Sequence, residues 1–201
     1  MPSVKRTLPI LFLALSLVAP ATALATDNSW RRETVLDVLQ RTDGAQALVA
    51  VVLVVDAAGV LDFSLARLLD NRRAEVVLLA PSNAAFENLL GLDPGALDGL
   101  SVAEVEDAIP GLLPSGVGPA EVSAILLKHA ALPRRANFYT ASEGVLLRRG
   151  SIEVADGSRF PVGIGASGVE INRETTIIRA NHLARNGVIH FIDTVILDGL
   201  L

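Results

Sequence analysis

The sequence predicts one α+β domain, with helices mainly in the first half and strands mainly in the second. Two observations lead to this prediction. Before Pro133, apolar residues recur at helical spacing behind residues that cap helices, whereas after Pro133 they alternate with a period of two. The strands do not alternate regularly with helices, which argues against a parallel α/β sheet.

Two helices are predicted in the N-terminal third of the chain. Ser29 is expected to cap the first, and Gly44 to end it. The second is expected over residues 45–57, where Asp43 and Gln46 have the spacing of a capping box. Because this segment is rich in valine, its periodicity also fits a buried strand.

A short amphipathic stretch, a buried strand and one more helix are predicted next. Residues 63–69 form a short amphipathic stretch, and the continuous apolar run over 75–79 is typical of a buried strand. Either Ser82 or Asn83 is expected to cap the following helix, which Gly91 closes.

Two helices complete the predicted helical half. Ser101 and Glu104 form a capping box for a helix that Pro110 is expected to end together with the glycine after it. Pro119 suits the first turn of the next helix, whose apolar face includes His129.

The C-terminal half is predicted to be a series of short strands. A hairpin turn is expected at Asp156-Gly157. Both alternating sets of side chains in the last strand are largely apolar, so this strand should be buried on both faces. Alternation places the strands at 152–154, 160–164, 169–171, 175–180 and 188–197.

The first 25 residues are typical of a secretory signal peptide. Lys5 and Arg6 precede an apolar run over 8–19, and small residues offer a cleavage site after Ala25. Cleavage would leave one domain, residues 26–201, that is exported to the medium, the periplasm or the cell surface without stable membrane insertion. An uncleaved N-terminal anchor is the alternative.

Charge and composition exclude several classes of protein. Removing Lys5 and Arg6 leaves 15 basic and 22 acidic residues, a net charge of −7 that argues against nucleic-acid binding. The chain has no cysteine, which excludes disulfides, thiol catalysis and thiolate metal sites. Four arginine pairs are scattered along the sequence and are interpreted as solvated surface unless folding gathers them onto one face. They begin at Arg31, Arg72, Arg134 and Arg148.

Two segments resemble the motifs of fasciclin domains. Residues 76–86 read Val-Val-Leu-Leu-Ala-Pro-Ser-Asn-Ala-Ala-Phe, similar to the box in which a buried strand runs through Ala-Pro-(Thr/Ser) into a helix. Residues 184–197 contain Asn-Gly-Val-Ile-His-Phe-Ile-Asp, similar to the closing box of the family. The resemblance extends over 33–197. The residues that carry it are Ala80, Pro81, Ser82, Phe86, His129, Asn186, Gly187, His190 and Asp193.

The chain departs from the family pattern in three places. Lys128 stands where relatives usually have the Tyr of a Tyr-His pair, so a partner contact made by that tyrosine is not expected here. The segments 63–73 and 108–118 look longer than usual, and loops often carry binding specificity.

The resemblance implies a wedge-shaped β-sandwich with helices packed along one edge, used outside the cytoplasm for adhesion or matrix interaction. The residues of the two boxes are then expected to be structural. Asn186-Gly187 should turn tightly through positive φ. His190 should enter the core, bond a partner there and link the sheet to the helical layer.

Catalytic and metal sites find little support in the sequence. The three histidines, His129, His182 and His190, lack metal-ligand spacing. A triad of Ser82, a histidine and Asp193 can be drawn, but Ser82 lacks a Gly-x-Ser-x-Gly elbow and is expected to cap a helix. No catalytic residue, cofactor or metal site is therefore predicted.

The leading hypothesis is a non-enzymatic adhesion or protein-interaction module whose partner is a surface or matrix protein or a glycan. The alternative is a binder of a small apolar ligand, a lipid or pigment, because the aliphatic short helices can form an apolar cleft. An enzyme ranks third.

Overall fold

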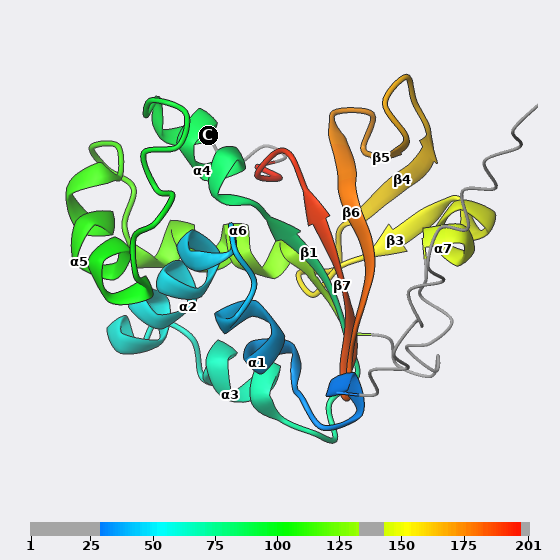
Figure 1. The fold of residues 1–201 in the computed structure, drawn as a ribbon, viewed down its shortest axis with the longest axis horizontal. Coiled ribbons are helices and arrows are strands. Elements are labelled where there is room, and N and C mark those ends of the chain that lie inside the picture. Colours follow the sequence, from blue (N-terminus) through cyan, green and yellow to red (C-terminus); the bar gives the residue numbers. More distant parts are fainter. Residues whose placement is uncertain (1–28, 133–142, 198–201) are drawn as a thin grey trace, which may run out of the picture.

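The computed structural model describes residues 29–132 and 143–197, and the predicted signal peptide lies outside them. Helices precede most of the strands, as the sequence predicts (Figure 1). The elements are η1 (Ser29–Arg31), α1 (Val35–Gln40), α2 (Gln46–Ala58), α3 (Leu65–Asp70), β1 (Val76–Pro81), α4 (Asn83–Leu90), α5 (Val102–Leu112), α6 (Pro119–His129), β2 (Ala130–Ala131), α7 (Glu143–Arg149), β3 (Ser151–Glu153), β4 (Arg159–Ile164), β5 (Val169–Ile171), β6 (Thr175–Ala184) and β7 (Gly187–Ile192).

The strands are hydrogen-bonded in the order β2-β1-β7-β6-β5-β4-β3. The first and last long strands, β1 and β7, pair in parallel, with Val76 opposite Gly187 and Pro81 opposite Ile192. The other neighbouring strands pair antiparallel. In Figure 1, β1, β7 and β6 converge at the lower end, while β3, β4 and β5 diverge from them. This spread produces the wedge that the family resemblance implies.

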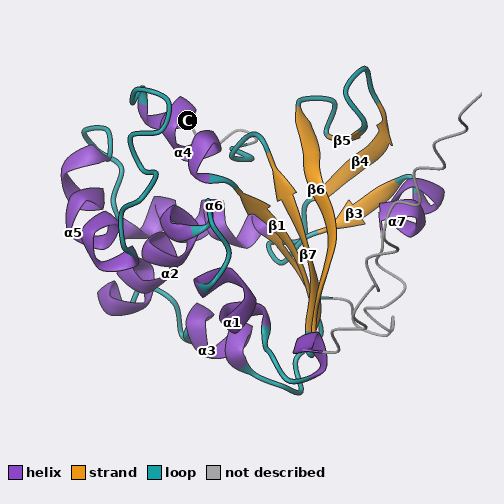
Figure 2. Cartoon of the chain, viewed as in Figure 1, coloured by secondary structure: helices purple, strands orange, loops and turns teal. Residues whose placement is uncertain are grey.

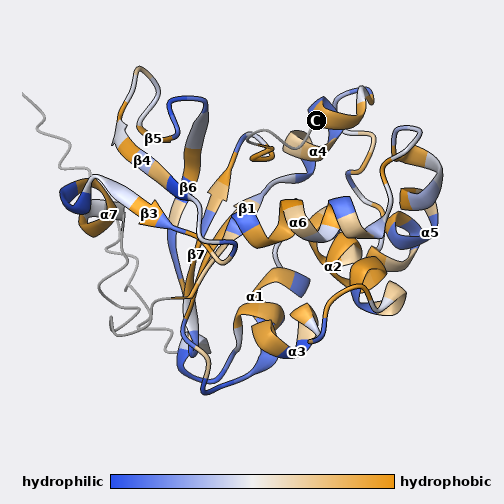
Figure 3. Ribbon diagram, turned by 180° about the vertical axis from the view of Figure 1, so that it is seen from behind, coloured by the Kyte–Doolittle hydropathy of each residue, from blue (hydrophilic) through white to orange (hydrophobic). Residues whose placement is uncertain are grey.

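Two apolar cores lie on opposite sides of the central strands. Alternate residues of β1 and β7 pack either against α1–α6 or against β3–β5, so both faces of β7 are buried as predicted. The helical layer lies on one side of the strands (Figure 2), and apolar residues are concentrated in α1, α2 and α6 (Figure 3). The residues of β1 and β7 in the helical core are Val76, Leu78, Ala80, Ile189 and Phe191. Those in the second core include Val77, Leu79, Phe160, Ile171 and Ile192.

The predicted start of the first helix is wrong. Ser29 begins the short 3₁₀ turn η1, and Thr34 caps α1 instead. The Thr34 hydroxyl oxygen accepts a hydrogen bond from the Asp37 N–H at 3.2 Å, and Asp37 Oδ2 accepts one from the Thr34 N–H at 2.8 Å. This reciprocal pair satisfies two of the amides that a helix N-terminus leaves without partners.

The second helix is confirmed, but its predicted cap is wrong. Ala45 occupies the N-cap position, so Asp43 lies too far upstream to cap α2. Gln46 instead accepts a hydrogen bond from the Gly44 N–H through Oε1 at 3.0 Å. The valine-rich segment forms a helix rather than a strand. Neighbouring helices cover most of its surface, and a helix satisfies its own backbone hydrogen bonds, so tertiary packing outweighs the strand preference of valine.

Most of the later caps are confirmed. Ser82 caps α4, and Ser101 and Glu104 form the capping box of α5. Pro119 opens α6, and Gly91 ends α4 with a left-handed φ of 67°. These signals are local, which explains why the sequence alone places them.

Other boundaries differ from the prediction. Pro110 lies inside α5, which continues to Leu112 because the Leu113 N–H still reaches the Ile109 carbonyl at 3.1 Å. The helix α7 was not predicted at all. The strand β7 ends at Ile192 rather than 197, because Asp193 turns the chain by pairing with Thr176.

Candidate functional site

Asn186 ties three segments together at the narrow end of the wedge. Its side chain is buried, and Oδ1 accepts a hydrogen bond from the Val35 N–H at 2.8 Å. Its Nδ2 donates to the carbonyls of Leu69 at 2.9 Å and Asn71 at 3.0 Å. The side chain therefore holds the start of α1 and the end of α3, while its backbone carbonyl accepts a hydrogen bond from the Val76 N–H at the start of β1.

Gly187 is needed for close packing and not for a special turn. Neither Asn186 nor Gly187 has a positive φ, so the expected reason for this dipeptide is wrong. A Cβ atom on Gly187 would lie 2.3 Å from the Val76 carbonyl oxygen and 2.8 Å from Val35 Cγ2. Only glycine lets β7 approach β1 and α1 this closely.

His129 connects the end of α6 to the C-terminal segment. Its Nδ1 lies 2.7 Å from the Ile125 carbonyl, which only accepts, so Nδ1 carries the proton. Its Nε2 then accepts from the Ile196 N–H at 2.9 Å. Burial lowers the pKa of His129 to about 4, an effect that the Ile125 hydrogen bond opposes and the Lys128 charge reinforces. The ring is neutral and fully committed.

His190 is buried, as predicted, but it does not face the helical layer. It pairs in register with Leu79, which belongs to the core beneath β3–β5, whereas its neighbours Ile189 and Phe191 face the helices. Its Nδ1 lies 3.4 Å from the Asn181 N–H, at the irregular part of the β6–β7 ladder. His190 therefore contributes to the β6–β7 pair and the strand core.

Ser82 and Asp193 are both used structurally. The Ser82 oxygen accepts the Ala85 N–H at 3.3 Å. Asp193 Oδ1 accepts from the Thr176 N–H at 2.8 Å and from the Thr194 hydroxyl at 3.0 Å. His129 is bonded to the Ile125 carbonyl and the Ile196 N–H, so both of its ring nitrogens are already used and it is not placed to act in a triad with Ser82 and Asp193.

The remaining motif residues are apolar parts of the helical side. Ala80 is fully buried in β1, Pro81 ends that strand, and Phe86 is buried on α4. Pro81 and Phe86 also line an apolar cleft.

This cleft lies between α2, α4, α5 and α6 and encloses about 60 Å³. Leu112, Leu113, Pro114 and Val117, from the long segment 108–118, form part of its wall. His129 is its only lining side chain with nitrogen atoms, and both are already bonded. The cleft therefore offers an apolar contact surface.

Two buried polar residues, Asn83 and Glu87, make tertiary hydrogen bonds that the sequence does not predict. Asn83 Oδ1 accepts the Ala47 N–H at 3.1 Å, and its Nδ2 donates to Gln46 Oε1 at 3.0 Å. Glu87 accepts from the amides of Gly95 at 2.9 Å and Leu97 at 2.8 Å, fixing the loop after α4. A polar residue inside an otherwise apolar helix face was the available signal.

Lys128, the departure from the family pattern, is also buried, and it makes an ion pair that the sequence does not predict. Its Nζ lies 3.0 Å from Asp156 Oδ2 and joins α6 to the β3–β4 turn. Burial raises the pKa of Asp156, but hydrogen bonds from Ser158 and Lys128 outweigh burial and leave the pKa below its usual value. The ammonium group is thus bound internally.

Across the described ranges, no group of three or more histidines or carboxylates is arranged to hold a metal ion. The same residues include no buried side-chain nitrogen or oxygen without a hydrogen-bond partner. None of the helices in the described part of the chain is long and apolar enough to cross a membrane. The motif side chains that could act in catalysis or metal binding instead form hydrogen bonds that stabilise the fold.

Comparisons with known proteins agree with this geometry. The family model of the fasciclin domain matches residues 54–198. A structure of a FAS1 domain pair from the insect cell adhesion molecule fasciclin I superposes with a TM-score of 0.59 at 16% identity. That match covers 82% of this chain and 51% of the insect one, so the present chain spans about half the insect chain's length. A search of curated proteins gave no significant match.

Proposed function

The chain belongs to the fasciclin domain family, and on that premise we propose that it is an exported, non-enzymatic module that binds a surface or matrix partner. Fasciclin domains are associated with cell adhesion and protein interaction in general. The predicted signal peptide supports export.

One observation carries the non-enzymatic part of the proposal. The polar side chains of the motifs form hydrogen bonds with backbone groups inside the domain. This holds for Ser82, His129, Asn186 and Asp193. A catalytic site needs a nucleophile or base that can reach a substrate. These side chains stabilise the scaffold, and the exposed surface is left to recognise a partner.

Export is tested by expressing the full chain with its own N-terminus. The protein is expected outside the cytoplasm with Thr26 as its first residue. A chain that stays in the cytoplasm with Met1 or Pro2 at its N-terminus would contradict export.

Binding is tested with the same protein, labelled with a fluorophore and titrated onto intact cells and cell-envelope preparations of the producing organism. Saturable binding that excess unlabelled protein displaces is expected. Binding that never saturates, or that denatured protein reproduces, would count against a folded recognition module.

The apolar cleft favours a second candidate function, the capture of a small apolar ligand such as a lipid chain. Its lining is almost wholly aliphatic or aromatic and is formed partly by the long segment 108–118. The enclosed volume is small, so a ligand would have to displace that segment or the side chains of α5.

A fluorescent fatty acid provides the test. Val51→Phe, which fills the cleft from α2, is expected to weaken uptake, while Ile164→Phe at a position that is 80% exposed on β4 serves as the control. Equal uptake by both variants would exclude the cleft as the site.

A further inference from the structure

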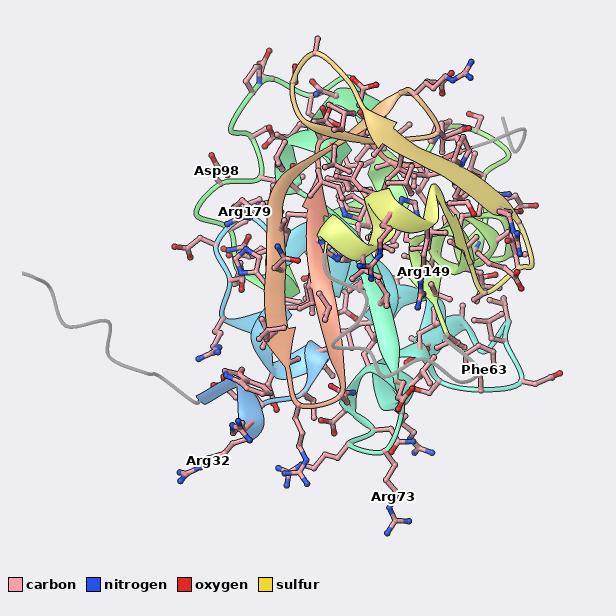
Figure 4. The ribbon with its side chains drawn as sticks, turned by 90° about the vertical axis from the view of Figure 1, so that its right-hand side faces the viewer. Arg32, Phe63, Arg73, Asp98, Arg149 and Arg179 are labelled. Carbon is pink, nitrogen blue, oxygen red and sulfur yellow. The ribbon has the colours of Figure 1, made fainter. Side chains whose placement is uncertain are left out.

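Folding brings five exposed arginines from three separate segments to the narrow end of the wedge. They come from η1 and the residue after it, from the turn between α3 and β1, and from the β6–β7 turn, and are Arg31, Arg32, Arg72, Arg73 and Arg185. Figure 4 shows Arg32 and Arg73 projecting from this same end, far from Arg149 and Asp98. We call these five residues the arginine end.

Hydrogen bonds connect the segments that carry these arginines. The Arg185 guanidinium donates from Nη1 to the Arg31 carbonyl at 3.3 Å, and the Arg185 N–H donates to the Glu33 carbonyl at 2.7 Å. The next residue, Asn186, donates to the Asn71 carbonyl at 3.0 Å. Arg31, Arg185 and the 71–74 turn are therefore linked by continuous contacts.

The backbone beneath the arginines is fixed, while their charged groups face solvent. Asn71 Oδ1 accepts the Arg73 N–H at 3.0 Å, and the Ala74 N–H closes the turn on the Asn71 carbonyl at 2.9 Å. The Arg31 guanidinium lies over the Trp30 ring, 4.7 Å from its centroid. A fixed backbone lowers the ordering cost of binding, because only side chains remain to be immobilised.

Most carboxylates near this end are already engaged. Glu33 forms an ion pair with Arg41, so the two charges cancel. Asp37 belongs to the capping box of α1, and Asp70 accepts a hydrogen bond from the Thr34 hydroxyl at 3.0 Å. Asp37, Asp70 and Glu75 are all exposed and keep their charge, so five arginines stand against three exposed carboxylates at this end. Within residues 29–132 and 143–197, none of the five arginines forms an ion pair with a carboxylate.

We propose that the arginine end binds an acidic polysaccharide, a glycan chain whose repeating units carry carboxylate or sulfate groups. This inference rests on the proposed function and names its partner class. The planar guanidinium group donates two parallel hydrogen bonds to a carboxylate or sulfate, which a lysine ammonium group does not. Five such groups at one end can contact several charges of one polysaccharide strand at once.

The surroundings favour a strand-like glycan over an anionic membrane. Outside the predicted signal peptide the chain carries a net charge of −7, so a broad anionic surface would repel most of the protein, whereas a thin strand meets only the arginine end. Peripheral membrane binding also draws on apolar side chains that enter the interface. Among the large apolar residues that the structure describes as exposed, only Leu183 lies within two residues of this end in the sequence.

The test uses the chain as it accumulates when expressed with its own N-terminus. Its affinity is measured for immobilised heparin and for polygalacturonate, and sedimentation with vesicles of phosphatidylglycerol and phosphatidylcholine is measured in parallel. Binding to at least one polysaccharide is expected to weaken with added salt, because screening acts on exposed charges.

Arg72→Ser with Arg73→Ser is expected to raise the Kd by about tenfold, since each removes a cation that faces the ligand. The matched control is Arg148→Ser with Arg149→Ser, an exposed pair on α7 that removes the same charge elsewhere. The control is expected to change Kd by less than about twofold. Thermal unfolding confirms that both variants remain folded.

Three outcomes would overturn the inference: no polysaccharide binding at low salt, an equal loss in both double variants, or binding to vesicles alone. Saturable cell binding that persists without polysaccharide binding would reject the glycan and leave the proposed function standing. Absence of both cell binding and polysaccharide binding would reject the proposed function together with the glycan inference.

Discussion

Asn186 Oδ1 accepts a buried hydrogen bond from the Val35 N–H at 2.8 Å, across a separation of 151 residues. This contact joins the first helix to the turn before the last strand, so the two ends of the domain are fixed to each other. The same side chain holds the end of α3. Motif residues of this kind make the narrow end rigid enough to present the arginines.

Asn186→Ala is expected to reduce the free energy of unfolding by about 2–4 kcal/mol, because it leaves one buried amide and two carbonyls without their partner. Asn186→Asp keeps an acceptor for the Val35 N–H but loses both donated bonds, so it should also destabilise the fold. Urea unfolding monitored by circular dichroism measures both. An unchanged unfolding midpoint for Asn186→Ala would contradict this structural role of Asn186.

Gly187→Ala is expected to cost about 2–4 kcal/mol, because its Cβ would overlap the Val76 carbonyl and force β7 away from β1. Gly163→Ala is the control, since its Cβ would meet nothing within 4 Å and its φ is not positive. Similar unfolding curves for the two variants would show that the close approach is not limiting.

Stability should rise with pH between about 4 and 6.5 because of His129. Burial lowers its pKa to about 4 in the folded state, while the unfolded histidine keeps a value near 6.5. The unfolded chain therefore binds the proton more readily, and stability is complete above the unfolded pKa and lost as pH falls toward the folded one. The full contribution is about 3 kcal/mol.

His129→Leu provides the comparison, because it removes the titrating ring. The loss of stability between pH 7 and pH 4.5 should be smaller in this variant than in the unchanged protein. His182→Ala should retain most of the loss, although burial and the Arg179 charge also lower the pKa of His182. Identical pH dependence in His129→Leu and the unchanged protein would exclude His129 as the source.

Asp156→Asn should lower the free energy of unfolding by about 1–3 kcal/mol, because it leaves the buried Lys128 ammonium group without its carboxylate partner. Lys128→Met should cost less, about 1 kcal/mol, because it removes the buried charge itself. Glu153→Gln disrupts the pair with Arg159, whose partners are 58% and 66% exposed, and should have almost no effect. A larger loss for Glu153→Gln than for Asp156→Asn would contradict this order.

The sequence predicts those features that local chemistry determines. Ser101, and either Ser82 or Asn83, are predicted as caps because a cap needs only the amides of the next turn, and the structure has Ser101 and Ser82 in these positions. The burial of β7 followed from its two apolar faces. Thr34 and Asp37 give only a weak capping-box signal in the sequence, because Asp at the third position is less typical than Glu.

The sequence could not predict the contacts between distant segments. Nothing near Asn186 indicates that its partner is Val35, and the requirement for Gly187 comes from the approach of β1 rather than from its own φ. The face of His190 depended on the pairing of β7 with β1. The arginine pairs at 31 and 72 are scattered in the sequence and meet only when the chain folds.

Hydrogen exchange at the amides of Val35 and Ile196 tests most directly whether the motif side chains are committed to the scaffold. These two amides donate to Asn186 and to His129. Both are expected to exchange only through global unfolding, at the rate of the slowest amides in β7. Exchange of either amide as fast as an exposed loop amide would show that its motif side chain is free, and would make Asn186 or His129 a candidate for partner binding.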